Sequence, residues 1–184
     1  MNWLVSNADL VLELTLVQMW LSVVPLVVAF VLSVPLGWCA FRYRPAGKVI
    51  VPATVLLYTI PSLPLLIFLP AILGTSLLDP INLVVALTLY SISLLVSQIV
   101  GGLSNVDHDL RLAGEALGFS RWQSFWKVEL PSAGPVILAG LRVASVSTIS
   151  LVSVGSLIGV SSLGYLFLNG FKRGIPEEVA TGIV

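Results

Sequence analysis

The chain has 184 residues, of which 57% are hydrophobic and 10% are charged, and its mean hydropathy is +1.04. Soluble domains carry about 25% charged residues, so this composition excludes an ordinary soluble protein and indicates one small integral membrane domain with a few spans. The net charge is zero and no run of Lys or Arg forms a basic arm, which argues against nucleic acid as a partner.

The first apolar run lacks the basic segment that precedes a secretory signal. No Lys or Arg comes before Arg42, and Asp9 and Glu13 lie where a signal would be basic. We therefore expect this run to remain in the mature protein. Cys39, the single cysteine, lies inside the run and can form neither an intrachain disulfide nor a cysteine metal cluster, so we interpret it as a packing residue.

Four apolar segments are long enough to cross a bilayer, since a helical span needs about 20 residues. They are approximately Leu14 to Phe41, Val49 to Leu73, Ile81 to Leu103 and Gly134 to Ile158. The second segment contains four prolines: Pro52, Pro61, Pro64 and Pro70. These prolines predict a kinked or partly unwound helix that lines the interior of a bundle, where neighbouring helices or water satisfy the freed backbone groups.

Residues Ile175 to Val184 have the form of the start of a further helix, with a proline near its first position and acidic residues in its first turn. Because the chain stops before this helix would cross, we expect either a truncated sequence or an end outside the membrane. The sequence thus predicts an all-α, polytopic membrane bundle. Residues 1–184 form one transmembrane domain with four complete spans plus the start of a fifth.

The basic residues of the connections indicate an orientation. Three of them separate the first two spans and three separate the third and fourth, whereas the connection from Gly74 to Pro80 has none. These residues are Arg42, Arg44 and Lys48, then Arg111, Arg121 and Lys127. The positive-inside rule places both basic connections in the cytoplasm and the N-terminus outside, although Lys172 and Arg173 then fall on the outer side.

The connection over residues 104–131 is predicted to contain two short helices. Asp107 is a suitable N-cap for the first, which ends near Leu117, and Gly118 permits the turn that follows. Ser120 and Gln123 have the spacing of a capping box, so a second helix is expected from Arg121. Pro131 is expected to stop it.

The second short helix carries Trp122, Phe125, Trp126 and Glu129 at helical spacing, which gives an aromatic stripe on a polar segment. Two interpretations remain open from the residues alone. The stripe packs on the cytoplasmic ends of its own spans or in the lipid interface, where Trp is common. Alternatively, part of it enters a groove on a soluble partner.

The same connection resembles the "EAA" loop of ABC importer permeases, the MetI-like inner-membrane components of binding-protein-dependent transport. That pattern is Glu-Ala-Ala, three residues, Gly, nine residues and then Ile-x-Leu-Pro. Here Ala113-Gly114, Gly118 and Val128-Glu129-Leu130-Pro131 have the same spacing. Leu112 stands where the family usually has Glu, and Glu115 is a partial substitute.

This resemblance implies that residues 104–131 form the coupling helix pair that docks on an ATPase subunit. The residues it implies for this contact are Ala113, Gly114, Glu115, Gly118, Phe119, Ser120, Trp122, Phe125, Leu130 and Pro131. Gly at position 114 is familiar in the osmoprotectant branch, which carries glycine betaine, carnitine or choline. The segments Thr59 to Leu66, Pro135 to Arg142 and Ser161 to Gly164 are also similar to that branch.

Polar residues in the spans form a possible translocation path: Tyr58, Ser62, Tyr90, Ser93, Ser97, Arg142 and Ser145. The stripe from Tyr90 to Gly101 has the small-residue spacing of a helix-packing surface, so both readings stay open. Arg142 either faces other helices or water, or its side chain extends to the cytoplasmic headgroups.

Nothing in the sequence predicts an enzyme. The chain has no Gly-Lys-Ser/Thr phosphate loop, because Gly47-Lys48 is followed by Val49, and the serines of the spans have no nearby base. We expect no catalytic, cofactor or metal residues, and ATP bound only by a partner subunit.

The resemblance therefore implies a permease subunit that imports a quaternary-ammonium osmoprotectant across the bacterial plasma membrane. It implies an ATPase, a second permease subunit and an extracytoplasmic solute-binding protein as partners. Within the same superfamily, the alternative is a permease for an amino acid or another small solute. A passive channel, a secondary transporter and a purely structural subunit are the rivals of other classes.

Overall fold

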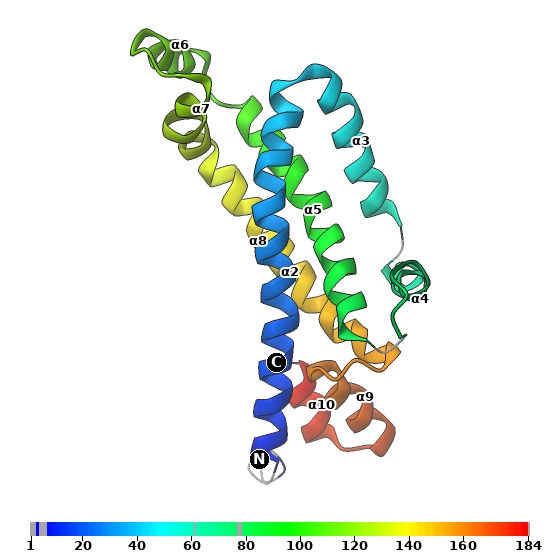
Figure 1. Ribbon diagram of the computed structural model, residues 1–184. Helices are drawn as coiled ribbons and strands as arrows, with labels where there is room; N and C mark the ends of the chain where they lie inside the picture. The colour runs from blue at the N-terminus through cyan, green and yellow to red at the C-terminus, as the bar shows by residue number, and fades with distance from the viewer. Residues whose placement is uncertain (1–2, 4–6, 61, 77–78, 184) are drawn as a thin grey trace. The chain divides into compact units, whose positions relative to one another are not determined.

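The computed structural model describes residue 3 and residues 7–60, 62–76 and 79–183, without the side chains of residues 62, 63 and 183, and every regular element in this part is a helix (Figure 1). In chain order the elements are α2 (Ala8–Arg42), α3 (Arg44–Thr59), α4 (Ser62–Leu73), α5 (Pro80–Ser104), α6 (His108–Ala116), α7 (Arg121–Ser124), η1 (Phe125–Glu129), α8 (Leu130–Gly155), η2 (Ser156–Ile158), α9 (Leu163–Arg173) and α10 (Pro176–Ile183). The predicted all-α class is confirmed for these residues.

Within the part of the chain that the structure describes, three helices are long and apolar enough to cross a membrane. They are Ala8–Arg42, Pro80–Ser104 and the continuous stretch Arg121–Ile158. The helices α3 and α4 meet the same criteria only when taken together as one interrupted span. The helices therefore cover the four predicted apolar segments, and α10 occupies the predicted start of a further helix.

The interruption expected in the proline-rich segment lies between Thr59 and Ser62. Pro52 and Pro70 remain inside α3 and α4, and Pro61 lies outside the described residues. A proline inside a helix removes one backbone hydrogen bond, and apolar packing on the remaining turns tolerates that loss. At least two of the four prolines, Pro52 and Pro70, therefore lie inside helices and not at the break.

The expectation that Pro131 stops the second short helix is wrong. The helix that begins at Arg121 continues through η1, a π-helical turn, into α8. In η1 the backbone N–H of Leu130 donates to the carbonyl of Phe125, five residues earlier. The ring of a proline normally clashes with the carbonyl four residues earlier, and a widened turn relieves that clash. The helix α8, which contains the predicted fourth apolar segment, thus begins at Leu130, four residues before Gly134.

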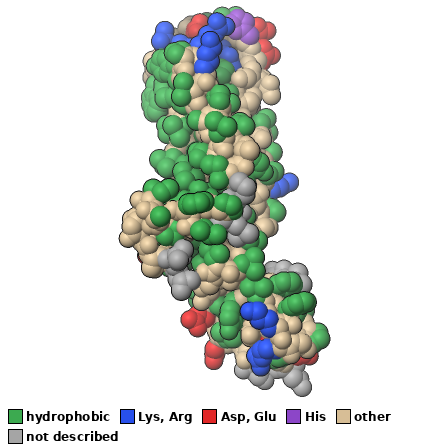
Figure 2. Space-filling model, turned by 90° about the vertical axis from the view of Figure 1, so that its right-hand side faces the viewer, with side chains coloured by type: hydrophobic (Ala, Val, Ile, Leu, Met, Phe, Trp, Pro, Cys, Tyr) green, Lys and Arg blue, Asp and Glu red, His purple; other side chains and the backbone are tan. Residues whose placement is uncertain are grey.

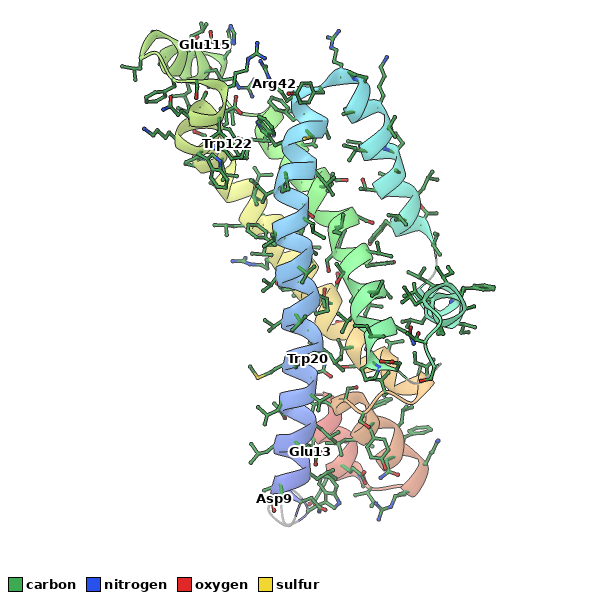
Figure 3. The ribbon with its side chains drawn as sticks, viewed as in Figure 1. Asp9, Glu13, Trp20, Arg42, Glu115 and Trp122 are labelled. Carbon is green, nitrogen blue, oxygen red and sulfur yellow. The ribbon has the colours of Figure 1, made fainter. Side chains whose placement is uncertain are left out.

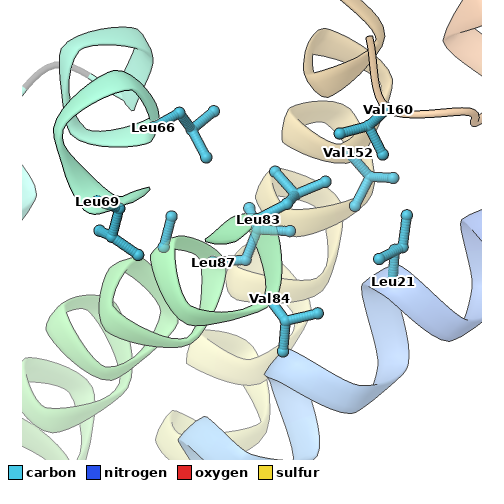
Figure 4. Packing of buried hydrophobic residues seen from close by; sticks show 9 residues of the cluster. Leu21, Leu66, Leu69, Leu83, Val84, Leu87, Val152 and Val160 are labelled. Carbon is cyan, nitrogen blue, oxygen red and sulfur yellow. The ribbon is translucent and has the colours of Figure 1, made fainter. Parts of the chain in front are cut away.

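The chain divides into two compact units, the first formed by Met1–Val28, Ile60–Thr88 and Ser145–Val184. Its core is a cluster of buried apolar side chains in which Leu21 of α2, Leu83 of α5 and Val152 of α8 take part (Figure 4). Leu66 and Leu69 of α4 belong to the same cluster. Burial of these side chains holds together segments that are far apart in the sequence.

Within the same unit, α9 has no counterpart among the predicted helices, because 11 residues are too few for a span. It pairs with α10 around Glu178, whose side chain is buried. The Nδ2 atom of Asn169 donates to Oε1 of Glu178 at 2.6 Å, and Nη1 of Arg173 lies 3.7 Å from Oε2. The hydrogen bond satisfies Oε1, whereas the buried Oε2 has no hydrogen-bond partner and only the more distant charge of Arg173 near it.

The second unit comprises Ala29–Thr59 and Leu89–Ala144. Its centre is formed by α5, where Leu95, Val96 and Ile99 have no exposed surface. The connection over residues 104–131, which contains α6, α7 and η1, belongs to this unit as well. The second unit therefore positions the segment that the sequence singled out.

The close packing of α9 on α8 gives a test of the first unit. A Cβ atom at Gly164 would overlap the carbonyl oxygen of Ser153 and would lie 2.7 Å from Oγ of Ser156. We expect Gly164→Ala to destabilise the protein by about 1 to 3 kcal/mol, as overpacked sites do. The measurement is the thermal unfolding of the detergent-solubilised protein.

Gly101→Ala is the matched control, because a Cβ at this helical glycine would meet nothing within 4 Å. It should leave the unfolding temperature unchanged or raise it slightly. Equal unfolding temperatures for the two variants would contradict the packing described for Gly164.

Candidate functional site

The connection between α5 and α8 is an elbow, here defined as residues 104–131, and its first arm is α6. Asp107 caps this helix, because Oδ1 of its side chain accepts a hydrogen bond from the backbone N–H of Asp109 at 3.0 Å. The cap satisfies a backbone donor that would otherwise lack an intrahelical partner. The predicted start of the first short helix is therefore confirmed.

The turn between the two arms is made at Gly118, whose φ of +75° lies in the left-handed region. The backbone N–H of Phe119 then donates to the carbonyl of Gly114 at 3.1 Å, which closes the end of α6. A residue with a Cβ atom resists this conformation, so the turn requires a glycine at position 118. The predicted turn is confirmed.

The second arm starts with the capping box that the sequence predicts. Oγ of Ser120 accepts from the backbone N–H of Gln123 at 3.3 Å, and Oε1 of Gln123 accepts from the backbone N–H of Ser120 at 2.9 Å. This reciprocal pair fixes the direction in which the chain leaves the turn. The elbow is thus defined by local hydrogen bonds at both of its helix starts.

The aromatic stripe of the second arm divides between an internal and an external side. Phe125 is 1% exposed, and its ring centroid lies 5.6 Å from that of Trp38 on α2. Trp122 contacts the same Trp38 ring edge-on, also at 5.6 Å, yet 57% of its surface is exposed, as is 47% of Trp126. Phe125 therefore packs on its own span, and both interpretations stay open for the two exposed tryptophans.

A single arginine joins four elements of this unit. The guanidinium of Arg111 on α6 lies 4.9 Å from the ring centroid of Phe41 on α2, and its Nη2 donates to the carbonyl of Leu103 on α5. Its Nε lies 3.7 Å from Oε1 of Glu129 in η1. Sequence reasoning used Arg111 only for orientation, since neither Phe41 nor Glu129 is near it in the chain.

A small cavity of about 160 Å³ lies beside Arg111, between the elbow and the end of α2. It is lined by Trp38, Phe41, Arg42, Arg111, Glu115, Phe119, Arg121, Ser124 and Glu129. Figure 2 shows charged side chains gathered at the end of the molecule that carries the elbow, and Figure 3 shows Arg42, Glu115 and Trp122 at that end. Apart from Arg142, the charged side chains of this unit therefore come from the elbow and also from Arg42, Arg44 and Lys48 near the connection of α2 and α3.

Most residues that the resemblance assigns to an ATPase contact lie on the surface of the elbow. Ala113, Glu115, Gly118, Ser120, Trp122 and Pro131 are exposed, and Phe119 and Leu130 are half-buried. Gly114 and Phe125 are buried instead. A Cβ at Gly114 would lie 3.5 Å from Cγ2 of Val128, which is an ordinary contact, so either Gly or Ala fits this position. Exposure alone does not establish what these residues bind.

Of the possible path residues, two aromatic side chains come together. The rings of Tyr58 on α3 and Tyr90 on α5 lie 5.0 Å apart. The hydroxyls of Ser93 and Ser97 donate to the carbonyls of Leu89 and Ser93, at 2.9 and 3.3 Å, which is the behaviour of helix-packing serines.

Of the remaining path residues, Arg142 belongs to the same compact unit as these two rings. Arg142 is exposed on α8, and Ser145 belongs to the other compact unit. The side chain of Ser62 lies outside the described residues. Among the residues that the structure describes, no group of three or more His, Cys, Asp or Glu side chains is placed to hold a metal ion.

Comparison with known proteins gives a consistent result. The family model described as "Binding-protein-dependent transport system inner membrane component" matches residues 29–178. The osmoprotectant import permease protein OsmW of Salmonella typhimurium is 33% identical over 93% of this chain and 80% of its own. The glycine betaine/carnitine/choline transport system permease protein OpuCB of Bacillus subtilis is 29% identical over 100% and 83%.

Solved structures with the same fold are ABC transporter chains. An inward-facing structure of the MetNI methionine ABC transporter superposes with a TM-score of 0.83 at 20% identity, over 97% of this chain and 88% of that one. An amino acid ABC transporter crystallised with histidines gives 0.78 at 16% identity, over 99% and 86%. At these identities the likeness shows the fold alone.

The internal anchor of the elbow can be tested by stability. We expect Phe125→Ala to cost about 3 to 5 kcal/mol, since it removes a fully buried ring from contact with Trp38. The residues of the elbow should then be cleaved by limited proteolysis at lower protease concentration.

Gln123→Ala is a control for the elbow as a whole, because it removes only one half of the capping box. Its cost should stay near 1 kcal/mol or below. If Phe125→Ala were no more protease-sensitive than Gln123→Ala, the aromatic packing would not hold the elbow.

Proposed function

Because the chain belongs to the family of binding-protein-dependent transport system inner membrane components, we propose that it is the permease subunit of an ATP-driven importer whose elbow contacts the ATPase subunit. The observation that carries this proposal is the division of the aromatic stripe. Phe125 fixes the elbow to α2 from inside, while Trp122 and Trp126 remain half-exposed beside it. A surface that is both rigid and accessible suits a contact that transmits force.

The first arm extends this exposed surface. Glu115 is exposed, and Leu117 at the end of α6 is 73% exposed. Apolar side chains at the edge of a charged surface are typical of a protein contact. We therefore assign the outer face of α6 and α7, rather than Phe125 or Gly114, to the ATPase.

The orientation that we propose has the elbow in the cytoplasm and the N-terminus outside the bacterial plasma membrane. Six basic residues then lie inside and two outside. The rule counts Lys and Arg rather than net charge, so Lys172 and Arg173 on the outer side oppose this orientation without reversing it. The orientation also fits four spans, with α3 and α4 together as the second.

ATP chemistry is assigned to the partner. Gly47 and Lys48 are not followed by the Ser or Thr of a phosphate loop, so we propose that this chain neither binds nor hydrolyses nucleotide. The complete importer would comprise two permease subunits, ATPase subunits and an extracytoplasmic solute-binding protein. Hydrolysis would move the elbow and switch access to the path.

The cargo that we propose is a quaternary-ammonium osmoprotectant such as glycine betaine, carnitine or choline. This rests on similar proteins whose names state those solutes, including the choline transport system permease protein OpuBB of Bacillus subtilis, which is 29% identical over 100% of this chain. The alternative is an amino acid, as in the names of the similar structures. Those structures share only the fold.

The cargo can be tested with the whole complex. Proteoliposomes that contain the permease, its ATPase and its binding protein should import glycine betaine or choline in an ATP-dependent manner, and import methionine at least about tenfold more slowly. The measurement is uptake of radiolabelled solute with and without ATP. Preferred uptake of methionine would replace the proposed cargo by the alternative.

The ATPase contact separates an importer subunit from a channel, a secondary transporter or a structural subunit. We expect Leu117→Asp to reduce the ATPase recovered by co-purification by roughly tenfold, which corresponds to about 1.4 kcal/mol. ATP-driven uptake should fall with it, while the permease itself still folds, because Leu117 is exposed.

Lys48→Gln is the matched control for this experiment. It changes the charge by the same amount at an exposed position of the other basic connection, outside the elbow. It should leave the recovered ATPase unchanged. Loss of the ATPase in both variants would indicate a general charge effect, and loss in neither would contradict the proposed contact.

A further inference from the structure

The first compact unit contains a cavity of about 370 Å³ that no predicted site residue lines. Its walls come from the end of α8, from η2 and from α9 and α10. The residues that matter are Ser150, Ser153, Ser156, Gly164, Phe167 and Gly182. This volume lies within the range of small-molecule sites, which are largely apolar with a few placed polar groups.

Two glycines give the cavity close-packed walls. A Cβ at Gly164 would overlap the carbonyl oxygen of Ser153, and a Cβ at Gly182 would lie 3.0 Å from the carbonyl oxygen of Leu163. The helices α9 and α10 can therefore approach α8 and each other only because these positions lack side chains. The hollow is part of the packed structure of this unit.

The serine hydroxyls of the cavity have already used their protons. Oγ of Ser150 donates to the carbonyl of Val146 at 2.9 Å, and Oγ of Ser156 donates to the carbonyl of Ser153 at 2.8 Å. Oγ of Ser153 donates to the carbonyl of Ile149 at 3.4 Å and accepts from Nε2 of Gln18 at 3.3 Å, which leaves it one lone pair. Each hydroxyl therefore offers an oxygen lone pair, and not a proton, to a molecule in the cavity.

No charged side chain is among the residues that line this cavity. The lone pairs of the serine oxygens repel an anionic group, and no cationic side chain lines the cavity to attract one. A primary ammonium is strongly hydrated, and the cavity holds no carboxylate to compensate the loss of its water. A cation that spreads its charge over methyl groups has no N–H donors to leave unpaired, and its C–H groups make weak contacts with oxygen.

The aromatic component is Phe167 of α9, which lines the cavity and is 41% exposed. The face of an aromatic ring attracts a cation, and quaternary ammonium groups are the ligands that proteins most often bind in this way. The ring and the serine oxygens thus favour the same chemical class from two independent directions.

From these observations we infer that the cavity binds the quaternary-ammonium group of the cargo within the permease itself. This inference rests on the proposed function. In the proposed orientation the cavity lies at the outer end of α8, where the solute leaves its binding protein. The permease would then select the cation a second time, with Phe167 as its aromatic contact.

The test uses thiol protection in the assembled complex. Ser150→Cys is introduced together with Cys39→Ser, which removes the single native cysteine. Saturating choline should slow the alkylation of this cysteine by N-ethylmaleimide at least about threefold. The neutral isostere 3,3-dimethylbutan-1-ol at the same concentration should not. If position 150 reacts too slowly, Leu157→Cys serves instead, since Leu157 lines the cavity and is 59% exposed.

Phe171→Cys is the control. Phe171 lies on α9, the helix that carries Phe167, is 76% exposed and does not line this cavity. Choline should not protect it. A second comparison adds Phe167→Leu or Phe167→Tyr to Ser150→Cys, and protection should be lost with Leu and kept with Tyr.

Several results would overturn the inference: no protection at position 150 or 157, equal protection at position 171, equal protection by the neutral alcohol, or protection that survives Phe167→Leu. Uptake by the wild-type complex is measured in parallel. Import of choline or glycine betaine without protection of the introduced cysteine would contradict the inference and leave the proposed function intact. Protection without import would show that the cavity binds choline but would contradict choline as the cargo, and with it the proposed function.

Discussion

The packing of Phe125 against Trp38 is the interaction on which the elbow depends. It joins the second arm of the elbow to α2 and leaves Phe125 only 1% exposed. Trp122 precedes Phe125 by three residues on the same helix face, and Trp126 follows Trp122 by four, so burial of Phe125 also fixes where both tryptophans lie. The contact to Phe41 and the ion pair with Glu129 hold the first arm through Arg111 in the same way. The buried contacts of Phe125 and Arg111 therefore determine which side chains the elbow exposes.

The hydrocarbon phase explains why polar groups in this protein are bonded to the backbone. Ser93 and Ser150 both donate to carbonyls of their own helices, since an unmet donor is costly where there is no water. Along α5 this makes serine a packing residue. Ser150 lines the cavity of the first unit. There the same hydrogen bond to the helix carbonyl uses the proton of the hydroxyl, so that its oxygen can only accept.

Local signals of the sequence predicted local structure well. Asp107, Gly118 and the Ser120–Gln123 capping box are where they were expected, because each acts on residues within a few positions. Pro131 did not end its helix, since the adjoining π-helical turn accommodates it. The burial of Phe125 depends on its contact with Trp38, and the cavity exists because Gly164 and Phe167 come together at its wall. Those contacts join distant segments, and periodicity alone contains no information on them.

The central claim is that the elbow faces the cytosol and contacts the ATPase. Its most direct test is a cysteine at Leu117, in a Cys39→Ser background, treated with a membrane-impermeant maleimide. The proposal predicts no labelling in right-side-out vesicles, labelling in inverted vesicles that lack the ATPase, and protection once the ATPase is added. Labelling of this cysteine from the outer face of right-side-out vesicles would contradict it.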